Sequence, residues 1–226
     1  MHTNAGTQIF RAFKYFPRPP KPAKLNRLRK VNNDFATHSR AFDGDLLSDE
    51  PTARRFTAMV EPHLDAAYNL ARWLTRNPDD ADDVVQEAYL RAFRFFEGFR
   101  GGDGRAWLLT IVRNTCYTWM KDNRRSEIQV EYDDENGSLS IDDTAEAPLH
   151  GADPQSLLMR AADGLRIEAA LRLLPTEFRE VLVLRELEEM SYKDIATIAD
   201  LPIGTVMSRL SRARAQLKRI LERMEP

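Results

Sequence analysis

The last quarter of the chain contains two helical patterns separated by a turn, and this arrangement constrains the fold more than any other feature. Ser191, with Asp194 three residues later, predicts a capping box that opens the first helix. Pro202 and Gly204 then interrupt the helical pattern. In the second helix, which is expected to start near Thr205, apolar residues recur at three- and four-residue steps and form one buried stripe: Val206, Leu210, Ala213, Leu217 and Ile220. This order predicts a helix-turn-helix.

The opposite side of the second helix combines small and basic residues. Small residues let a helix lie deep in the major groove of DNA, and basic residues at its margins can contact phosphates. The residues expected on this side and its flanks are Thr205, Ser208, Arg209, Ser211, Arg212, Arg214, Ala215, Lys218 and Arg219. A solvated basic face without a ligand is the alternative, because most charge runs on helices are of that kind. The turn and the paired helix favour DNA binding.

Charge is strongly segregated along the chain, although the formal net charge is only -2. Residues 1–50 are polar and begin with a basic, proline-containing run, which predicts a flexible tail that either contacts nucleic acid by charge or has no role. Carboxylates concentrate between residues 127 and 146, which predicts a flexible acidic linker. We therefore expect an all-α protein with a tail over 1–50, a helical domain over 51–125, a linker over 126–160 and a helix-turn-helix domain over 161–226.

Several function classes are not supported by the sequence. Cys116 is the only cysteine, so an internal disulfide and a cysteine-rich zinc site are excluded. The four histidines lack ligand spacing, and the chain contains no glycine-rich phosphate loop or nucleophile elbow. We expect no metal, no cofactor and no catalytic residue, and hence no enzyme. The chain has neither a secretory signal nor an apolar run of the ~20 residues that a membrane helix needs, which predicts a cytoplasmic protein.

Residues 79–96 form the clearest helix of the first domain, with aspartates at its start that suit the helix dipole. Its buried stripe is expected to contain Val85, Ala88, Tyr89, Ala92, Phe93 and Phe96. On the other side lie Asp83, Gln86, Glu87, Leu90 and Arg94. A leucine among polar groups on an exposed face suggests a protein partner, but single exposed leucines are also common. Spacing alone does not decide between these interpretations.

A glycine-rich loop, residues 98–105, joins this helix to a second one over residues 106–123. One side of the second helix carries Trp107, Thr110, Asn114, Tyr117 and Lys121, and a separate apolar sector contains Leu108, Ile111, Val112, Thr115 and Trp119. Aromatic rings beside amide, hydroxyl and ammonium groups can stack on unpaired bases and bind their edges. Aromatic residues at helical spacing are more often part of a core, however, and the pattern alone favours the core.

Together these segments resemble bacterial RNA polymerase sigma factors, specifically the compact extracytoplasmic-function (ECF) group of the sigma-70 family, which keeps only regions two and four. The resemblance covers most of residues 56–125 and 165–223. Residues 80–93 are similar to the family's core-polymerase-binding helix and residues 105–114 to its promoter-melting helix. Residues 174–181 and 191–214 are similar to region four. Three such motifs in the right order, with a linker between them, are highly specific.

The resemblance implies a subunit that binds core RNA polymerase, recognises the minus-thirty-five and minus-ten promoter elements, and promotes DNA melting. It implies that the clamp helices of the polymerase beta-prime subunit are bound by Asp83, Gln86, Glu87, Leu90 and Arg94. Minus-ten DNA would be contacted by Arg100, Arg105, Asn114 and Lys121, with the loop 99–105 beside a pocket for a flipped base. The minus-thirty-five element would be contacted by Thr205, Ser208, Arg209, Ser211, Arg212, Arg214 and Lys218.

The resemblance also implies further partners and leaves two alternatives. Region four is expected to meet the polymerase beta flap, and an anti-sigma factor is expected to pack between the two domains. Asp200 stands where many relatives have a turn glycine and Met207 where a lysine is frequent, which bears on promoter sequence rather than on role. A sigma-like decoy that sequesters an anti-sigma factor is the first alternative, and the arginines of the last helix argue against it. A nucleic-acid-modifying enzyme is the second, but the sequence offers it no catalytic constellation.

Overall fold

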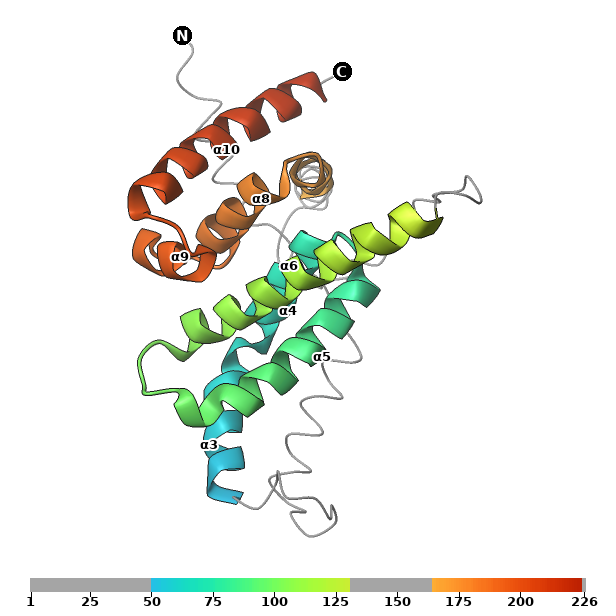
Figure 1. The fold of residues 1–226 in the computed structure, drawn as a ribbon. Helices are drawn as coiled ribbons and strands as arrows, with labels where there is room; N and C mark the ends of the chain where they lie inside the picture. Colours follow the sequence, from blue (N-terminus) through green and yellow to red (C-terminus); the bar gives the residue numbers. More distant parts are fainter. Residues whose placement is uncertain (1–49, 131–163, 225–226) are drawn as a thin grey trace, which may run out of the picture.

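The computed structural model of the chain describes residues 50–130 and 164–224, and all regular structure in these two ranges is helical (Figure 1). The first range contains α3 (Glu50–Val60), α4 (Leu64–Thr75), α5 (Pro78–Phe95) and α6 (Gly104–Val130), with short 3-10 turns η1 (Glu61–His63) and η2 (Phe96–Gly98). The second contains a helix over 164–172, α8 (Thr176–Leu182), the π-helical η3 (Val183–Leu187), α9 (Tyr192–Ala199) and α10 (Ile203–Arg223). The predicted all-α fold with two helical domains is confirmed. The basic tail and most of the acidic linker lie outside the described residues.

The first domain is built on α4, α5 and α6, which pack against one another, with α3 against α6. Its core includes an aromatic cluster in which the Phe56 ring meets Tyr89, Phe93 and Phe96 edge to face, at centroid distances of 5.0, 5.1 and 5.3 Å. Each such pair adds about 0.5–1.5 kcal/mol beyond the area that it buries. Because three of these rings come from α5 and its continuation into η2, the cluster fixes which face of α5 points inward. The predicted stripe of α5 is therefore the face packed against the core.

The glycine-rich loop before α6 has a defined conformation. Gly101 and Gly102 have φ angles of 91° and 109°, which favour glycine. Asp103 accepts hydrogen bonds through Oδ1 from the backbone N–H groups of Arg105 (2.9 Å) and Ala106 (3.3 Å), so it caps α6. The helix then runs to Val130 rather than to the predicted end near residue 123, because no proline or glycine stops it earlier.

The second domain contains the predicted helix-turn-helix. Ser191 caps α9, and its capping box with Asp194 is present. Pro202 is the N-cap residue of α10, so α10 begins at Ile203, two residues before the predicted start. The buried stripe of α10 consists of Val206, Leu210, Ala213, Leu217 and Leu221, and Ile220 is half-buried. The only difference from the expected stripe is therefore at its last turn.

Asp200 ends α9 in the left-handed conformation, with φ 53° and ψ 55°. This conformation costs most L-residues about 1–2 kcal/mol, and aspartate somewhat less. We expect Asp200→Gly to raise the free energy of unfolding of this domain by about 0.5 kcal/mol and Asp200→Ala to lower it. Urea titrations of the three proteins test this order. A more stable alanine variant would contradict the backbone argument.

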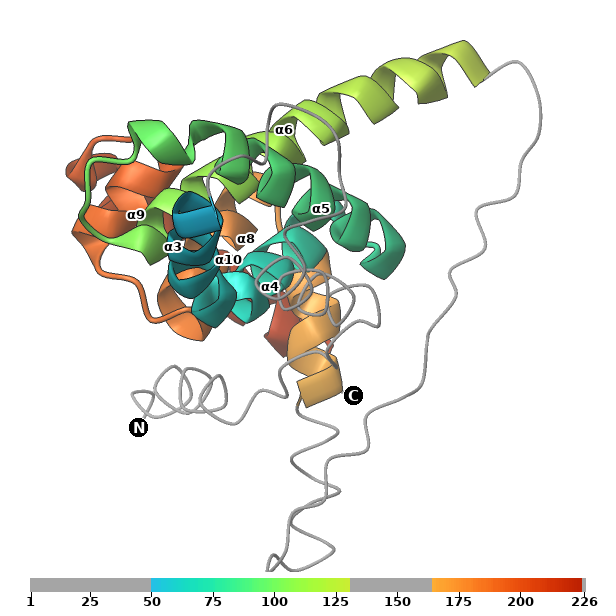
Figure 2. The same cartoon turned by 90° about the horizontal axis from the view of Figure 1, so that it is seen from below.

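The two domains lie side by side in Figure 1, and in Figure 2, seen from below, the first domain lies largely in front of the second. α9 packs along α6, and α8 packs against α4. The surface between the domains is therefore formed by α4 and by α6, the helix that was expected to melt DNA, on one side, and by α8 and α9 on the other.

Candidate nucleic-acid and protein interfaces

The polar face of α5 is exposed along its length. The side chains of Asp83, Gln86, Glu87, Leu90 and Arg94 are all exposed. Leu90, at 47 % exposure, is one of the few large apolar side chains on the described surface. The Arg91 Nε–Glu87 Oε1 ion pair, at 2.8 Å, joins exposed groups one turn apart and contributes little to stability. The structure thus brings all five residues of the predicted patch to one accessible face.

The residues expected to contact minus-ten DNA are divided between solvent and the second domain. Arg100, Asn114 and Lys121 are exposed. Asn114 accepts a hydrogen bond through Oδ1 from Arg113 Nη1, at 3.2 Å. Arg105 instead reaches across to the second domain, where its Nη2 lies 2.5 Å from Oε2 of Glu188. Trp107 packs on Phe99, with ring centroids 5.0 Å apart, as the core interpretation expects.

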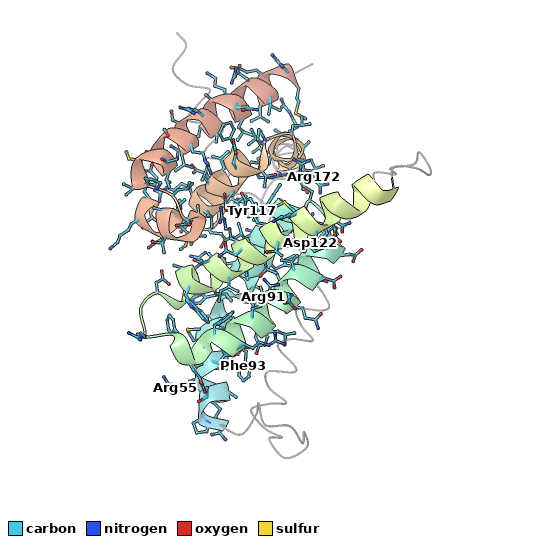
Figure 3. All side chains as sticks on the ribbon, viewed as in Figure 1. Arg55, Arg91, Phe93, Tyr117, Asp122 and Arg172 are labelled. Atoms are coloured by element: carbon cyan, nitrogen blue, oxygen red, sulfur yellow. The ribbon has the colours of Figure 1, made fainter. Side chains whose placement is uncertain are left out.

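Two buried carboxylates of the second domain anchor the contact between the domains. Glu180, with 0 % exposure, accepts hydrogen bonds from Arg113 Nε (2.7 Å) and from the Tyr117 hydroxyl (3.1 Å) of α6. Glu188, with 3 % exposure, accepts hydrogen bonds from Asn69 Nδ2 and from Arg105. In Figure 3, Tyr117 lies where α6 meets the second domain. Sequence reasoning missed both carboxylates, because the sequence alone gives no sign of their partners on other helices.

The electrostatics at this contact follow from burial and from Glu180. Burial, followed by the charge of Glu180 and its hydrogen bond, raises the pKa of Tyr117 to about 12. Burial alone would lower the pKa of Arg113, but the charge and hydrogen bond of Glu180 outweigh it, so the pKa of Arg113 rises. Both groups therefore hold their protons at neutral pH. The contact also includes an ion pair between Arg72 Nη2 and Glu168 Oε1, at 3.3 Å.

The face of α10 that was predicted to contact DNA is open to solvent. Ser208, Ser211 and Arg212 are exposed, and Thr205 and Arg209 are half-buried. Beside them Ile203 and Met207, one turn apart, are about half exposed and were not among the predicted contacts. The face therefore combines hydroxyl, guanidinium and apolar groups, which is the mixture that major-groove readers use for base edges and thymine methyls.

Two other predicted contacts of α10 are engaged within the second domain. Arg214 donates to Glu186 Oε1 through Nε (3.1 Å) and Nη2 (2.6 Å). Burial would lower the pKa of Arg214, but its hydrogen bond to Glu186 and the charge of Glu186 outweigh burial and raise it. Lys218 Nζ lies 3.7 Å from Glu222 Oε1. Arg214 therefore ties α10 to η3, whereas Lys218 remains at the surface.

The described residues offer few features for other kinds of chemistry. They contain no group of three or more His, Cys, Asp or Glu side chains that could hold a metal ion. Cys116 is buried, and burial raises the pKa of its thiol, so a reactive thiolate is disfavoured. None of the helices over 50–130 and 164–224 is both long enough and apolar enough to cross a membrane.

Comparison with known protein families gives two matches, one over each described domain. Sigma-70 region 2 matches residues 59–126, and Sigma-70, region 4 matches residues 157–217. Together they cover more than half of the chain. The first match spans α4, α5 and most of α6, and the second spans the helices from 164 through most of α10.

Similar individual proteins point the same way. The ECF RNA polymerase sigma factor SigE of Mycolicibacterium smegmatis is 31% identical over 82% of this chain and 68% of its own length. The ECF RNA polymerase sigma-E factor of Haemophilus influenzae is 35% identical over 66% of this chain and 77% of its own. Among solved structures, the sigma factor RpoE of Bartonella quintana, crystallised with the anti-sigma factor NepR, is 29% identical with a TM-score of 0.58. That similarity covers 75% of this chain and 98% of that one.

Proposed function

Because this chain belongs to the ECF group of the sigma-70 family of RNA polymerase sigma factors, we propose that it binds core RNA polymerase and directs promoter-specific initiation of transcription. Regions 2 and 4 on one chain, each with an exposed interaction face, are the observation that supports this function most strongly. A sigma factor is a regulatory initiation factor, and we assign the nucleotide chemistry to the polymerase rather than to this chain. Its site of action is then the cytoplasm.

We assign the exposed face of α5 to core binding. Leu90 is the apolar centre of the face, and it is surrounded by charged and amide groups. Such a pattern, an apolar contact inside a polar rim, is typical of protein interfaces. We propose that the beta-prime clamp helices are bound by Asp83, Gln86, Glu87, Leu90 and Arg94, and that the second domain also meets the beta flap.

We assign α6 and the loop before it to minus-ten DNA. Asn114 presents an exposed amide that can both donate to and accept from a base edge. Arg100 and Lys121 add exposed positive charge near the same helix. Arg105 completes the set once it is released from Glu188, and the turn at Gly101 and Gly102 borders the proposed pocket for a flipped base.

We assign the open face of α10 to the minus-thirty-five element. Ser208 and Arg212 are exposed near the middle of the face, where side chains reach base edges. The flanking basic groups contribute charge toward phosphates. The proposed contacts are Thr205, Ser208, Arg209, Ser211, Arg212, Arg214 and Lys218. We also propose an anti-sigma factor as a partner, as in the solved Bartonella quintana complex.

The roles of Arg212 and Arg214 should differ measurably. A bidentate arginine–guanine contact discriminates by about 1–3 kcal/mol, whereas a phosphate contact is blind to sequence. We expect Arg212→Ala to reduce the preference for a matched over a scrambled minus-thirty-five duplex by about tenfold. We expect Arg214→Ala to weaken both duplexes alike and to reduce the salt slope by about 1. Fluorescence anisotropy at several salt concentrations measures both effects.

Glu186 provides the matched control, because it holds Arg214 in the free protein. Glu186→Gln keeps the size of the side chain and removes its charge, which weakens its attraction for Arg214, so binding to both duplexes should strengthen. Arg214→Ala also removes an internal ion pair, so its unfolding temperature must be recorded alongside. Equal loss on matched and scrambled duplexes for Arg212→Ala would refute the base-reading role.

Run-off transcription tests the proposed function as a whole. Purified core polymerase is supplied with a pool of promoter fragments, with and without this chain. We expect defined transcripts only when the chain is present. The decoy alternative predicts instead that the chain binds an anti-sigma factor and yields no transcript with core polymerase.

A further inference from the structure

We propose that the chain inhibits itself through a carboxylate latch, in which two glutamates of the second domain hold the basic side of α6 and keep the domains closed. The latch consists of Glu180 and Glu188 together with their partners in the first domain, namely Asn69, Arg105, Arg113 and Tyr117. The functional consequence rests on the proposed function, because inhibition here means that the promoter elements cannot be engaged. The closed arrangement itself does not depend on that function.

The closed arrangement is too compact to reach both promoter elements. Elements centred near minus ten and minus thirty-five are about 25 base pairs apart, which is about 85 Å along B-DNA. A compact body of the size of the described residues has a radius of gyration of about 15 Å. Hydrogen bonds such as Arg113 Nε to Glu180 Oε1, at 2.7 Å, hold the two domains in direct contact. Simultaneous binding of both elements therefore requires these bonds to break.

The latch also occupies groups that DNA would need. A carboxylate on a guanidinium takes the same donors that a phosphate would take. Glu188 holds Arg105, which is one of the proposed minus-ten contacts. Glu180 holds Arg113, whose Nη1 in turn donates to the exposed amide of Asn114. The second domain thus competes with promoter DNA for the basic side of α6.

The latch contains an element that opposes closure. Arg179, next to Glu180, has 0 % exposure, and its Nε and Nη1 have no hydrogen-bond partner among residues 50–130 and 164–224. Its Nη2 donates a hydrogen bond to Thr176 Oγ1, at 3.1 Å, within its own helix. Arg76 of the first domain lies close enough to act on its charge. A buried guanidinium without an anion favours any state in which it regains water, so opening relieves Arg179.

Closure leaves the core-binding face free. Leu90 and Glu87 on α5 are exposed in the closed arrangement, and neither belongs to the latch. The closed chain can therefore meet polymerase before it meets promoter DNA. The latch accordingly predicts inhibition of promoter engagement rather than of core binding.

The distance between the domains is measured in the full chain by fluorescence energy transfer, with no polymerase or DNA present. Dyes are attached at Glu97→Cys and Arg223→Cys, which replace exposed residues in the two domains, while buried Cys116 stays unlabelled. We expect Glu180→Gln with Glu188→Gln to raise the open-to-closed ratio at least tenfold. Arg179→Met, which replaces an unpaired buried charge by an apolar chain, should lower that ratio several-fold.

Glu186→Gln is the matched control, because Glu186 makes the same kind of ion pair but within the second domain, and it should leave the distance unchanged. If the glutamine pair destabilises the second domain, Arg113→Gln with Tyr117→Phe removes the bonds to Glu180 from the first domain instead and should also open the chain, to a smaller extent because the bonds to Glu188 remain. Unchanged energy transfer in both pairs, or opening by Arg179→Met, would overturn the latch. If the domains open as expected but no variant supports transcription, the latch stands and the proposed function fails.

Discussion

Replacing Leu90 and Glu87 together by alanine is expected to lower the affinity of the chain for core polymerase by about 100-fold, or about 2.7 kcal/mol. Both side chains are exposed on α5, and a central apolar residue with a charged neighbour commonly carries about 1–2 kcal/mol each at an interface. Neither side chain belongs to the core of the first domain, so the fold should persist. Co-purification with core polymerase and a binding titration measure the loss.

Glu97→Ala is the control for this experiment. Glu97 is an exposed carboxylate in η2, the turn that follows α5, and it lies outside the proposed patch. Its loss should leave the affinity for core polymerase within about twofold of the original value, as expected for a surface site away from the interface. Unchanged co-purification of the Leu90 and Glu87 double variant would remove α5 from the polymerase interface.

Asn114→Ala is expected to suppress promoter opening at least tenfold while core binding and closed-complex formation stay nearly normal. Asn114 is exposed on α6 and can bind the edge of an extruded base, so its loss removes a contact that exists only after melting. Removing Gly102 should act in the same step, because the positive φ angles at Gly101 and Gly102 shape the turn that borders the proposed pocket. Permanganate footprinting of unpaired thymines on linear templates measures opening directly.

Asn123→Ala makes the same chemical change on the opposite side of α6. Nine residues along an α-helix correspond to a rotation of about 180°, and Asn123 is exposed as well. This variant should melt promoters normally. A pre-melted template should rescue Asn114→Ala, and a variant that is equally inactive on linear and pre-melted templates would exclude a specific role in opening.

Local patterns predicted much of this fold because their causes lie within a few residues. The capping box at Ser191 and the break at Pro202 depend only on near neighbours, and both appear in the structure. The buried stripe of α10 follows from helical periodicity, and it fails only at its last turn, where Leu221 is buried and Ile220 is half-buried. The exposed face of α5 was predictable in the same way, whereas only the family resemblance indicated a partner for it.

The contact between the domains could not be predicted from local patterns. Glu188 is bound by Asn69, 119 residues earlier, and Glu180 by Arg113, 67 residues earlier. In the sequence, both glutamates look like solvated charges, because helical periodicity does not indicate which residue of another helix a side chain will bind. The ion pair of Arg214 could not be predicted from local sequence either, because its partner, Glu186, lies 28 positions away on η3.

The aromatic residues of α6 show why the sequence pattern was compatible with two interpretations, a core position and a surface for unpaired bases. Trp107 packs against Phe96 and Phe99 and so contributes to the core. Tyr117 instead lies in the contact between the domains and donates to Glu180. Both side chains were expected on one side of the helix, and only their tertiary neighbours separate their roles.

The central claim, that this chain gives core polymerase its promoter specificity, is tested most directly by mapping transcript 5′ ends on genomic DNA in vitro. Core polymerase is incubated with fragmented DNA from the native cell, with the chain, without it, or with Arg212→Ala. The account predicts a reproducible set of start sites that appears only with the chain and is preceded by two shared sequence blocks, the upstream one weakened by Arg212→Ala. Start sites that are the same with and without the chain, or that share no upstream sequence, would contradict it.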